Sequence, residues 1–185
     1  LLGAPILYYG DEISMSDAYI PPEKRVDTAG LIAPEVYPGR DPNRTPMQWT
    51  PEPNAGFTVN DVEPWLPVAA SRTTINVQTQ SSDPTSTLNF YKVLLHLRQQ
   101  SSALRTGSIQ FLADTDAEIL AYLRESADER LLIAINFSSE PRSLRLPDSA
   151  RSTQCLLSSA SPRPDADSGA EIALAPFESV LLKLI

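Results

Sequence analysis

The segment Gly39–Trp49, GRDPNRTPMQW, carries the side chains of this sequence that are best suited to ligand chemistry. It places two arginines, Arg40 and Arg44, beside two prolines and an aspartate, and it follows neither a helical nor a strand period. An arginine presents five N–H donors in a fixed fork and keeps its charge. Two such forks on a rigid loop are typical either of structural ion pairs or of contacts with a ligand. Asp41 and Pro42 predict a short turn that aims Arg40.

Length and composition limit the partners that such a loop can serve. At 185 residues with 42% hydrophobic side chains, the chain is long enough for one ordinary domain or two small ones. The net charge of -8 argues against nucleic acid or an anionic membrane as a partner, and no apolar run is long enough to span a bilayer. One cysteine, Cys155, and one histidine, His96, exclude a disulfide framework and a histidine pair for a metal. We expect no cofactor and no metal site.

The N-terminal residues have the pattern of an interior strand. The sequence opens LLGAPILYYG, with no initiator Met, no charged leader and no cleavage-site pattern, so we expect a piece of a longer chain. Pro5–Tyr9 is a short apolar run that ends at Gly10, which predicts a buried strand of a parallel sheet.

A long proline-rich stretch follows this run. From residue 11 to about residue 82 the sequence shows no regular period, which predicts a long functional loop rather than helices or strands. Its aromatic side chains Trp49, Phe57 and Trp65 are expected to anchor the loop by packing rather than to contact a ligand.

A helix is predicted over residues 83–100. Asp83 suits the N-cap position and Pro84 suits the first helical position. Apolar residues recur at helical spacing, so we expect the helix to be mostly buried. The residues of this face are Phe90, Val93, Leu94 and Leu97.

After Gly107 the hydrophobic pattern changes to a period of two. The short segments with this pattern are GSIQFL, AEILAYLRE, RLLIAINFS, PRSLRLP, TQCLLSS, AEIALA and ESVLLKLI. Evenly spaced strands separated by turn residues predict an antiparallel sandwich, and the boundary falls near Leu104–Gly107. The preceding order of strand, loop and helix is one unit of a (β/α) barrel. Because such barrels build their active sites from the loops after the strands, the arginine loop would lie over an active site.

Several stretches resemble one family of enzymes. GAPILYYGDEISM closely resembles the last barrel strand of the alpha-amylase superfamily of glycoside hydrolases. GRDPNRTPMQWTPEPNAGF resembles a signature of its alpha-glucosidase and oligo-1,6-glucosidase branch, which also includes trehalose synthases and sucrose isomerases. PWLPV, TINVQTQ, LNFYKVLLHLRQQSSALRTGS and LAPFESVLLKL continue the resemblance in register. The segment Asp17–Tyr37, which includes IPPE, is similar to bacterial alpha-glucosidases.

The resemblance implies a fold and the location of the catalytic residues. The fold class is α/β plus all-β: residues 1–104 would be the last strand-loop-helix unit of a (β/α)8 TIM barrel, and residues 105–185 an antiparallel β-sandwich C-terminal domain. Enzymes of this family are retaining and use two carboxylic acids and a third, stabilising aspartate. All three are expected upstream of Leu1, so this chain would supply no catalytic residue and would be inactive alone.

What the resemblance leaves for this chain is substrate recognition. In similar alpha-glucosidases, the arginine at the position of Arg40 binds hydroxyls of the terminal glucose, paired with an upstream aspartate. This geometry implies exo cleavage of short oligosaccharides. Asp41 would aim Arg40, Arg44 would brace the loop or border the pocket, Glu12 would bond to the local backbone, and Tyr9 would support the loop. Asp11 and Glu12 are not the catalytic pair of the family.

Other functions stay open at this point. The parent protein would be a trehalose synthase or sucrose isomerase if a sugar accepts the glucosyl group. A transporter heavy chain would share the barrel but lack its carboxylates. A carbohydrate-binding module would need exposed aromatics in the C-terminal part, where Phe111, Tyr122, Phe137 and Phe177 have core-like patterns. Partners are expected to be a small sugar substrate and the N-terminal barrel portion, without nucleic acid or membrane, in a bacterial cytoplasm.

Overall fold

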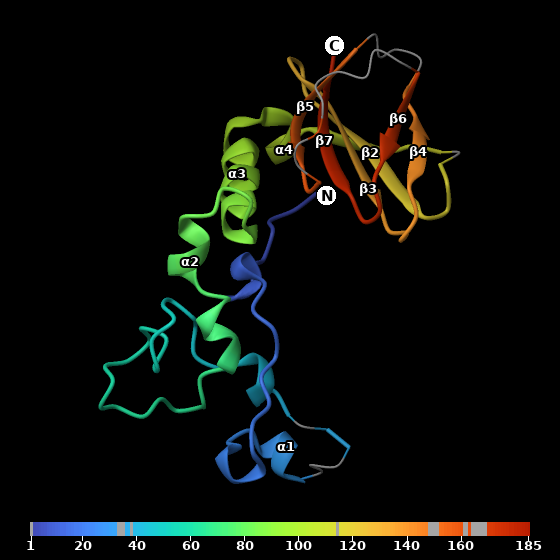
Figure 1. Ribbon diagram of the computed structural model, residues 1–185. Helices are drawn as coiled ribbons and strands as arrows, with labels where there is room; N and C mark the ends of the chain where they lie inside the picture. The colour runs from blue at the N-terminus through green and yellow to red at the C-terminus, as the bar shows by residue number, and fades with distance from the viewer. Residues whose placement is uncertain are drawn as a thin grey trace. The chain divides into compact units, whose positions relative to one another are not determined.

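The computed structural model (Figure 1) describes residues 2–32, 36–37, 39–113, 115–147, 152–160, 163 and 170–185. The chain forms two compact units, which are described separately. One unit is Pro5–Tyr91, and the other is Lys92–Ile185 together with the residues up to Ala4. The proposed division between a barrel end and a sandwich after residue 104 stays a prediction.

The first unit is built from short helical turns, so the expectation of no regular element over residues 11–82 is wrong in detail. The elements are η1 (Asp11–Ile13), η2 (Pro22–Lys24), α1 (Thr28–Ile32), η3 (Asp41–Asn43), η4 (Ala70–Thr73), α2 (Val77–Ser81) and the start of α3 (Thr87–Gln100). Each turn is too short to show a hydrophobic period, so the sequence pattern does not reveal it. Asn76 caps α2 by accepting a hydrogen bond from the Thr79 amide at 2.7 Å.

The run Pro5–Tyr9 does not form the predicted strand. No residue from 5 to 9 belongs to a strand, and the side chains of Ile6 and Leu7 are 94% and 45% exposed. A strand exists only through hydrogen bonds to a neighbour, and no described segment of this chain pairs with the run. An apolar run predicts that a segment is buried, but it does not show which strand the segment pairs with.

A small core holds the first unit together. Ile13, Met47 and Leu88 are buried against one another. Gln80 links the same elements: its Nε2 donates to the Ile13 carbonyl at 2.8 Å, and its Oε1 accepts from the Leu88 amide at 3.0 Å. Gln80 therefore connects η1 and α2 with the start of α3.

Helix α3 begins later than predicted. Asp83 forms a local turn in which its carboxylate accepts from the Thr85 amide at 2.8 Å. Ser86 is the residue that caps the helix, since its hydroxyl accepts from the Asn89 amide at 3.2 Å. The prediction of a mostly buried helix is also wrong, because Leu88 is the one buried residue of α3. The helical period identifies an apolar face but not an element that covers it.

The C-terminal unit contains two antiparallel sheets, coloured yellow to red in Figure 1. All seven predicted strand segments form strands. One sheet has the order β1-β2-β3-β7-β5, from Ser108–Phe111, Ile119–Glu125, Arg130–Asn136, Ser179–Leu184 and Thr153–Ser158. The other pairs β4 (Arg142–Arg145) with β6 (Glu171–Leu174).

Alternate residues of the larger sheet face two different clusters. Leu123, Leu132 and Leu182 pack with Leu144 and Ile172 of the smaller sheet in one apolar core. The opposite face carries Leu131 and Leu181, which pack against Ala103 and Leu104 of α4 (Ser102–Thr106), a helix that the sequence did not predict. Because successive side chains of a strand point to opposite faces, the continuous apolar runs of β2 and β3 place apolar residues on both faces of these strands.

Candidate functional site

The Arg40 side chain is held by Asp27, which lies thirteen residues earlier in the loop. Its Nε donates to Asp27 Oδ2 at 3.0 Å and its Nη2 donates to Asp27 Oδ1 at 2.8 Å. The Arg40 backbone N–H also donates to Asp27 Oδ2, at 2.7 Å. A bidentate pair fixes the plane of the guanidinium as well as its position. The Asp27 side chain is 3% exposed, whereas that of Arg40 is 52% exposed.

Asp41 holds the segment that carries Asp27. Its side chain is buried, and Oδ2 accepts from the backbone N–H groups of Val26 at 2.7 Å and Asp27 at 2.9 Å. Arg40 thus binds the side chain of Asp27, and Asp41 binds the backbone of Val26 and Asp27. Asp41 also begins the turn η3, as the sequence predicts.

Gly39 lets the two segments approach. Its φ of 82° lies in the left-handed region, and a Cβ there would meet Asp27 Oδ2 and the Gly30 backbone at 3.0 Å. Any other residue would push against the carboxylate that orients Arg40. The glycine that precedes the arginine is therefore part of the geometry of the pair.

The pair shifts the protonation of both groups toward the charged forms. Hydrogen bonds from the side chain and backbone of Arg40 hold the pKa of Asp27 well below its ordinary value of 3.8. The hydrogen bond to Asp27 likewise raises the pKa of Arg40 above its ordinary range. Both side chains are charged across the physiological range of pH.

Tyr9, Glu12 and Arg44 come together at a second place in the same unit. They line a half-open hollow of about 390 Å³, with Thr45, Pro46 and Met47 and with the aromatic side chains of Trp49, Phe57 and Trp65. The three aromatics were expected to be packing anchors, but they are 48%, 43% and 55% exposed. They line a surface hollow and keep about half of their surface exposed.

Local hydrogen bonds fix the polar rim of this hollow. The Tyr9 hydroxyl donates to the Thr45 carbonyl at 3.0 Å, and Glu12 Oε2 accepts from the Gly10 amide at 2.8 Å. Burial raises the pKa of Tyr9, and the nearby Tyr8 adds to the shift, so the hydroxyl is a neutral donor at physiological pH. Tyr9 thereby ties the N-terminal run to the RTPMQW segment.

Two buried polar atoms of the RTPMQW segment lack a partner among the described residues. Thr45 Oγ1 and Gln48 Nε2 make no hydrogen bond there, and both residues are 0% exposed. Gln48 Oε1, in contrast, accepts from the Ser71 hydroxyl at 3.2 Å. Unpaired buried polar atoms are rare in proteins, so this segment is a place where further contacts are expected.

The predicted site residues therefore fall into two sets. Arg40 and Asp41 both form hydrogen bonds with Asp27, whereas Tyr9, Glu12 and Arg44 line the hollow. Asp27 was not predicted, because its partner lies far along an aperiodic loop. An aspartate before a short helix at Thr28 was the only signal, and it equally predicts a helix cap.

The C-terminal unit corrects one expectation about aromatic residues. Phe111, Phe137 and Phe177 are 56%, 58% and 64% exposed, and of the four aromatics there only Tyr122 is buried. Phe111 lies on an edge strand, while Phe137 and Phe177 lie in adjacent turns, where the Phe177 amide donates to the Ser138 carbonyl. Alternation along a strand does not predict the side chains beyond its end. Core-like patterns are thus no argument against a carbohydrate-binding module.

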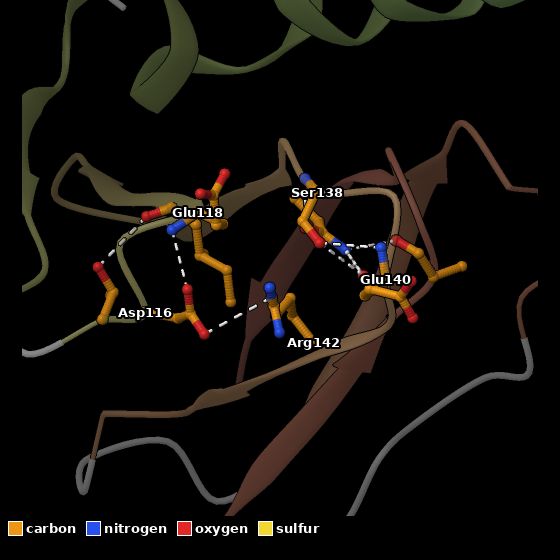
Figure 2. Close-up of polar contacts among 9 residues, drawn as sticks. Asp116, Glu118, Ser138, Glu140 and Arg142 are labelled. Carbon is orange, nitrogen blue, oxygen red and sulfur yellow. Dashed lines mark hydrogen bonds and ion pairs between the residues drawn. The ribbon is translucent and has the colours of Figure 1, made fainter.

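Polar contacts order the turn beside Phe137 (Figure 2). The Ser138 hydroxyl accepts from the Glu140 amide at 2.9 Å, and buried Asn136 donates to the carbonyls of Glu140 and Ala175 at 2.8 and 2.9 Å. Nearby, Arg142 pairs with Asp116 at 3.6 Å (Figure 2). These contacts account for the turn geometry and bring no catalytic constellation together.

The described residues contain neither a candidate metal cluster nor a candidate membrane-spanning helix. No group of three His, Cys, Asp or Glu side chains within that part of the chain is arranged to hold a metal ion. None of its helices is both long and apolar enough to cross a membrane.

Both parts of the sequence match known families. Residues 1–107 match the alpha amylase catalytic domain, and residues 109–181 match the maltogenic amylase C-terminal domain. The chain belongs to the alpha-amylase family, in agreement with the resemblance seen in its motifs.

Relatives and solved structures agree with this assignment. The probable oligo-1,6-glucosidase 2 of Bacillus subtilis is 36% identical over 195 residues, which cover 96% of this chain and 34% of that protein. The trehalose-6-phosphate hydrolase of the same organism is 28% identical, over 98% of this chain and 35% of its own. The trehalulose synthase MutB from Pseudomonas mesoacidophila superposes with a TM-score of 0.86 at 32% identity, over 99% of this chain and 36% of that one. The chain thus spans about a third of the length of these proteins.

Proposed function

We propose that this chain is the C-terminal part of a retaining, exo-acting alpha-glucosidase, and that it supplies the loop that binds the terminal glucose. The observation that carries the proposal is the held but half-exposed guanidinium of Arg40. Asp27 occupies Nε and one N–H of Nη2, while Nη1 donates to none of the described residues. The edge of the fork that faces away from Asp27 can therefore donate to two neighbouring hydroxyls of a sugar.

Several features support this role for the loop. Family membership and the glucosidase names of relatives agree with a glycoside hydrolase. The unpaired atoms of Thr45 and Gln48, the uncovered run Pro5–Tyr9 and the exposed face of α3 agree with packing against further barrel strands. On this proposal residues 1–104 complete a barrel, and the two sheets of residues 105–185 form a sandwich.

Chemistry would come from carboxylates outside this chain. A retaining glycosidase needs a nucleophile and an acid/base about 5 Å apart, so that a covalent glycosyl-enzyme intermediate forms and is then released to water. Asp11 and Glu12 do not fit this pair, since the carboxylates accept from the local amides of Tyr8 and Gly10. Arg40 would hold the terminal ring still while those groups act, which is a positioning contribution.

A second candidate differs only in the acceptor. The likeness to a trehalulose synthase, with a TM-score of 0.86, favours transfer of the glucosyl group to a sugar instead of water. Product analysis separates the two, because hydrolysis of a disaccharide releases free glucose, whereas isomerisation retains both sugars in one product.

The proposal is tested with the full-length protein that contains this chain. We expect it to release glucose from maltose and isomaltose and to leave internal bonds of soluble starch uncut, and we expect residues 1–185 alone to be inactive. Random internal cutting of starch would contradict the exo assignment. Full activity of the isolated chain would contradict the placement of the catalytic carboxylates.

A further inference from the structure

We propose that Asp27 is the positioning residue for Arg40 and that its negative charge makes the terminal-sugar subsite select neutral glucose over glucose phosphorylated near Arg40. This inference rests on the proposed function and names the residue that sets its specificity. Asp27 itself would not contact the sugar.

The positioning part follows from how Asp27 is held. Its backbone N–H donates to the buried carboxylate of Asp41, and its own Oδ1 accepts from the Ala29 amide at 3.4 Å. Its two oxygens meet Nε and Nη2 of Arg40, and Oδ2 also accepts from the Arg40 backbone. Both ends of the Arg40 residue are thus fixed to one carboxylate. A side chain with four rotatable bonds keeps one direction only through such contacts.

The selectivity part follows from charge. A lone arginine is a strong binder of phosphate, since its fork matches two phosphate oxygens. Here the same guanidinium already carries a carboxylate counter-charge in direct contact, and Asp41 adds a second carboxylate bonded to the same segment. The three groups carry one positive and two negative charges. Neutral hydroxyls accept hydrogen bonds from the remaining N–H groups without an electrostatic cost, whereas a phosphate would meet both carboxylates.

A purely structural ion pair explains these features less well. An arginine that only braces a loop gains most when its donors are all used. Arg40 leaves one edge unused by the described residues, on a side chain that is 52% exposed. Asp27, which orients Arg40, is buried, as expected of a carboxylate that bonds to a neighbouring side chain rather than to solvent.

The experiment compares two substrates on the full-length enzyme: p-nitrophenyl α-glucoside and its 6-phosphate. The variants are Asp27→Asn, which removes the charge with little change of shape, and Asp27→Glu, which keeps the charge and displaces it. Glu63→Gln is the matched control, because Glu63 pairs with Lys24 in the same unit at an exposed site. Each variant is assayed for kcat and KM on both substrates.

We expect the wild type to prefer the neutral substrate. Asp27→Asn should raise the ratio of kcat/KM for the phosphorylated over the neutral substrate by about tenfold, with a higher KM for the neutral one. Asp27→Glu should raise that KM without changing the ratio, and Glu63→Gln should change neither. A wild-type preference for the phosphorylated substrate would overturn the inference, as would an unchanged ratio in Asp27→Asn or an unchanged KM in Asp27→Glu.

Failure of this inference and failure of the proposed function look different. If the wild type cleaves neither glucoside, the proposed function fails. If it cleaves the neutral glucoside while the Asp27 variants behave like Glu63→Gln, the glucosidase stands and only the role of Asp27 is lost. If Asp27→Asn does not fold, the inference is still tested by the substrate preference of the wild type and by the KM of Asp27→Glu for the neutral substrate.

Discussion

The carboxylate of Asp27 and the guanidinium of Arg40 form two parallel hydrogen bonds, at 3.0 and 2.8 Å, and the same carboxylate accepts from the Arg40 backbone at 2.7 Å. One acidic side chain thus sets both the backbone and the side chain of the arginine that leads the RDPNRTPMQW segment. Three measurable consequences follow for protonation, for the preceding glycine and for sugar binding.

The first concerns protonation. The pKa of Asp27 is lowered below its ordinary value of 3.8 by the bonds from Arg40, so the ionised form is favoured in the folded loop. The stabilisation that this carboxylate contributes is complete above about pH 3.8 and is lost as the pH falls through the lowered value. Carboxylate NMR titration should show Asp27 ionised below pH 3.8. Arg40→Ala should return its pKa toward the ordinary value, and an unshifted pKa in the wild type would contradict the pair.

Gly39 provides a test of the approach between the two segments. In Gly39→Ala the new Cβ would meet Asp27 and the Gly30 backbone at 3.0 Å, and φ would stay in the left-handed region, which costs roughly 1–2 kcal/mol. We expect amide hydrogen exchange at Val26, Asp27 and Arg40 to accelerate about tenfold. Gly3→Ala is the control, since Gly3 also has positive φ but nothing within 4 Å. Equal exchange in Gly39→Ala and the wild type would show that the segments are not held together.

Phe177 provides a test of backbone strain in the C-terminal unit. Its φ of 56° is unfavourable for a residue with a Cβ, and its side chain is 64% exposed. Phe177→Gly should therefore be more stable than Phe177→Ala by about 1 kcal/mol, because the two share the loss of the ring and differ in strain. Urea unfolding followed by far-UV circular dichroism measures the difference. If Phe177→Ala were the more stable, the turn would not be strained.

Exposed apolar surface should govern how the isolated 185-residue chain behaves. Ile6, Ile32 and Tyr19 in the first unit are 94%, 84% and 79% exposed, whereas the C-terminal unit has a continuous core. We expect the chain to bind a hydrophobic dye and to self-associate, and we expect limited proteolysis to leave a resistant fragment that begins near Gly107. A monomer that unfolds in one cooperative step across both units would contradict the proposal that the first unit completes a barrel.

The strands of the C-terminal unit could be predicted because each one is marked by neighbouring residues in the sequence. β2 and β3 each carry a continuous apolar run, ILAYL and LLIAI, and turn residues separate the strands. The run Pro5–Tyr9 has an equally apolar sequence, but a strand also needs a pairing partner, which no local pattern supplies. The start of α3 moved from Asp83 to Ser86 because both residues are good caps and only the structure shows which one bonds to the helix.

The site was predictable in part for a similar reason. Arg40 and Asp41 stand in a recognisable segment, and the turn at Asp41 follows from its Asp-Pro pair. Asp27 lies in a separate segment without period or motif, so its pairing with Arg40 depends on tertiary structure alone. The hollow lined by Tyr9, Arg44 and Trp49 also joins residues far apart in the chain.

Whether this loop binds the terminal glucose is tested by the kcat/KM of the full-length enzyme with Arg40→Ala on maltose and isomaltose. Charge-assisted hydrogen bonds contribute roughly 1.5–3 kcal/mol each, so we expect a loss of about 100-fold in kcat/KM on both substrates. Arg44→Ala, the matched arginine of the same segment, should lose much less. An Arg40→Ala enzyme with wild-type kcat/KM would contradict the claim that this loop binds the terminal glucose.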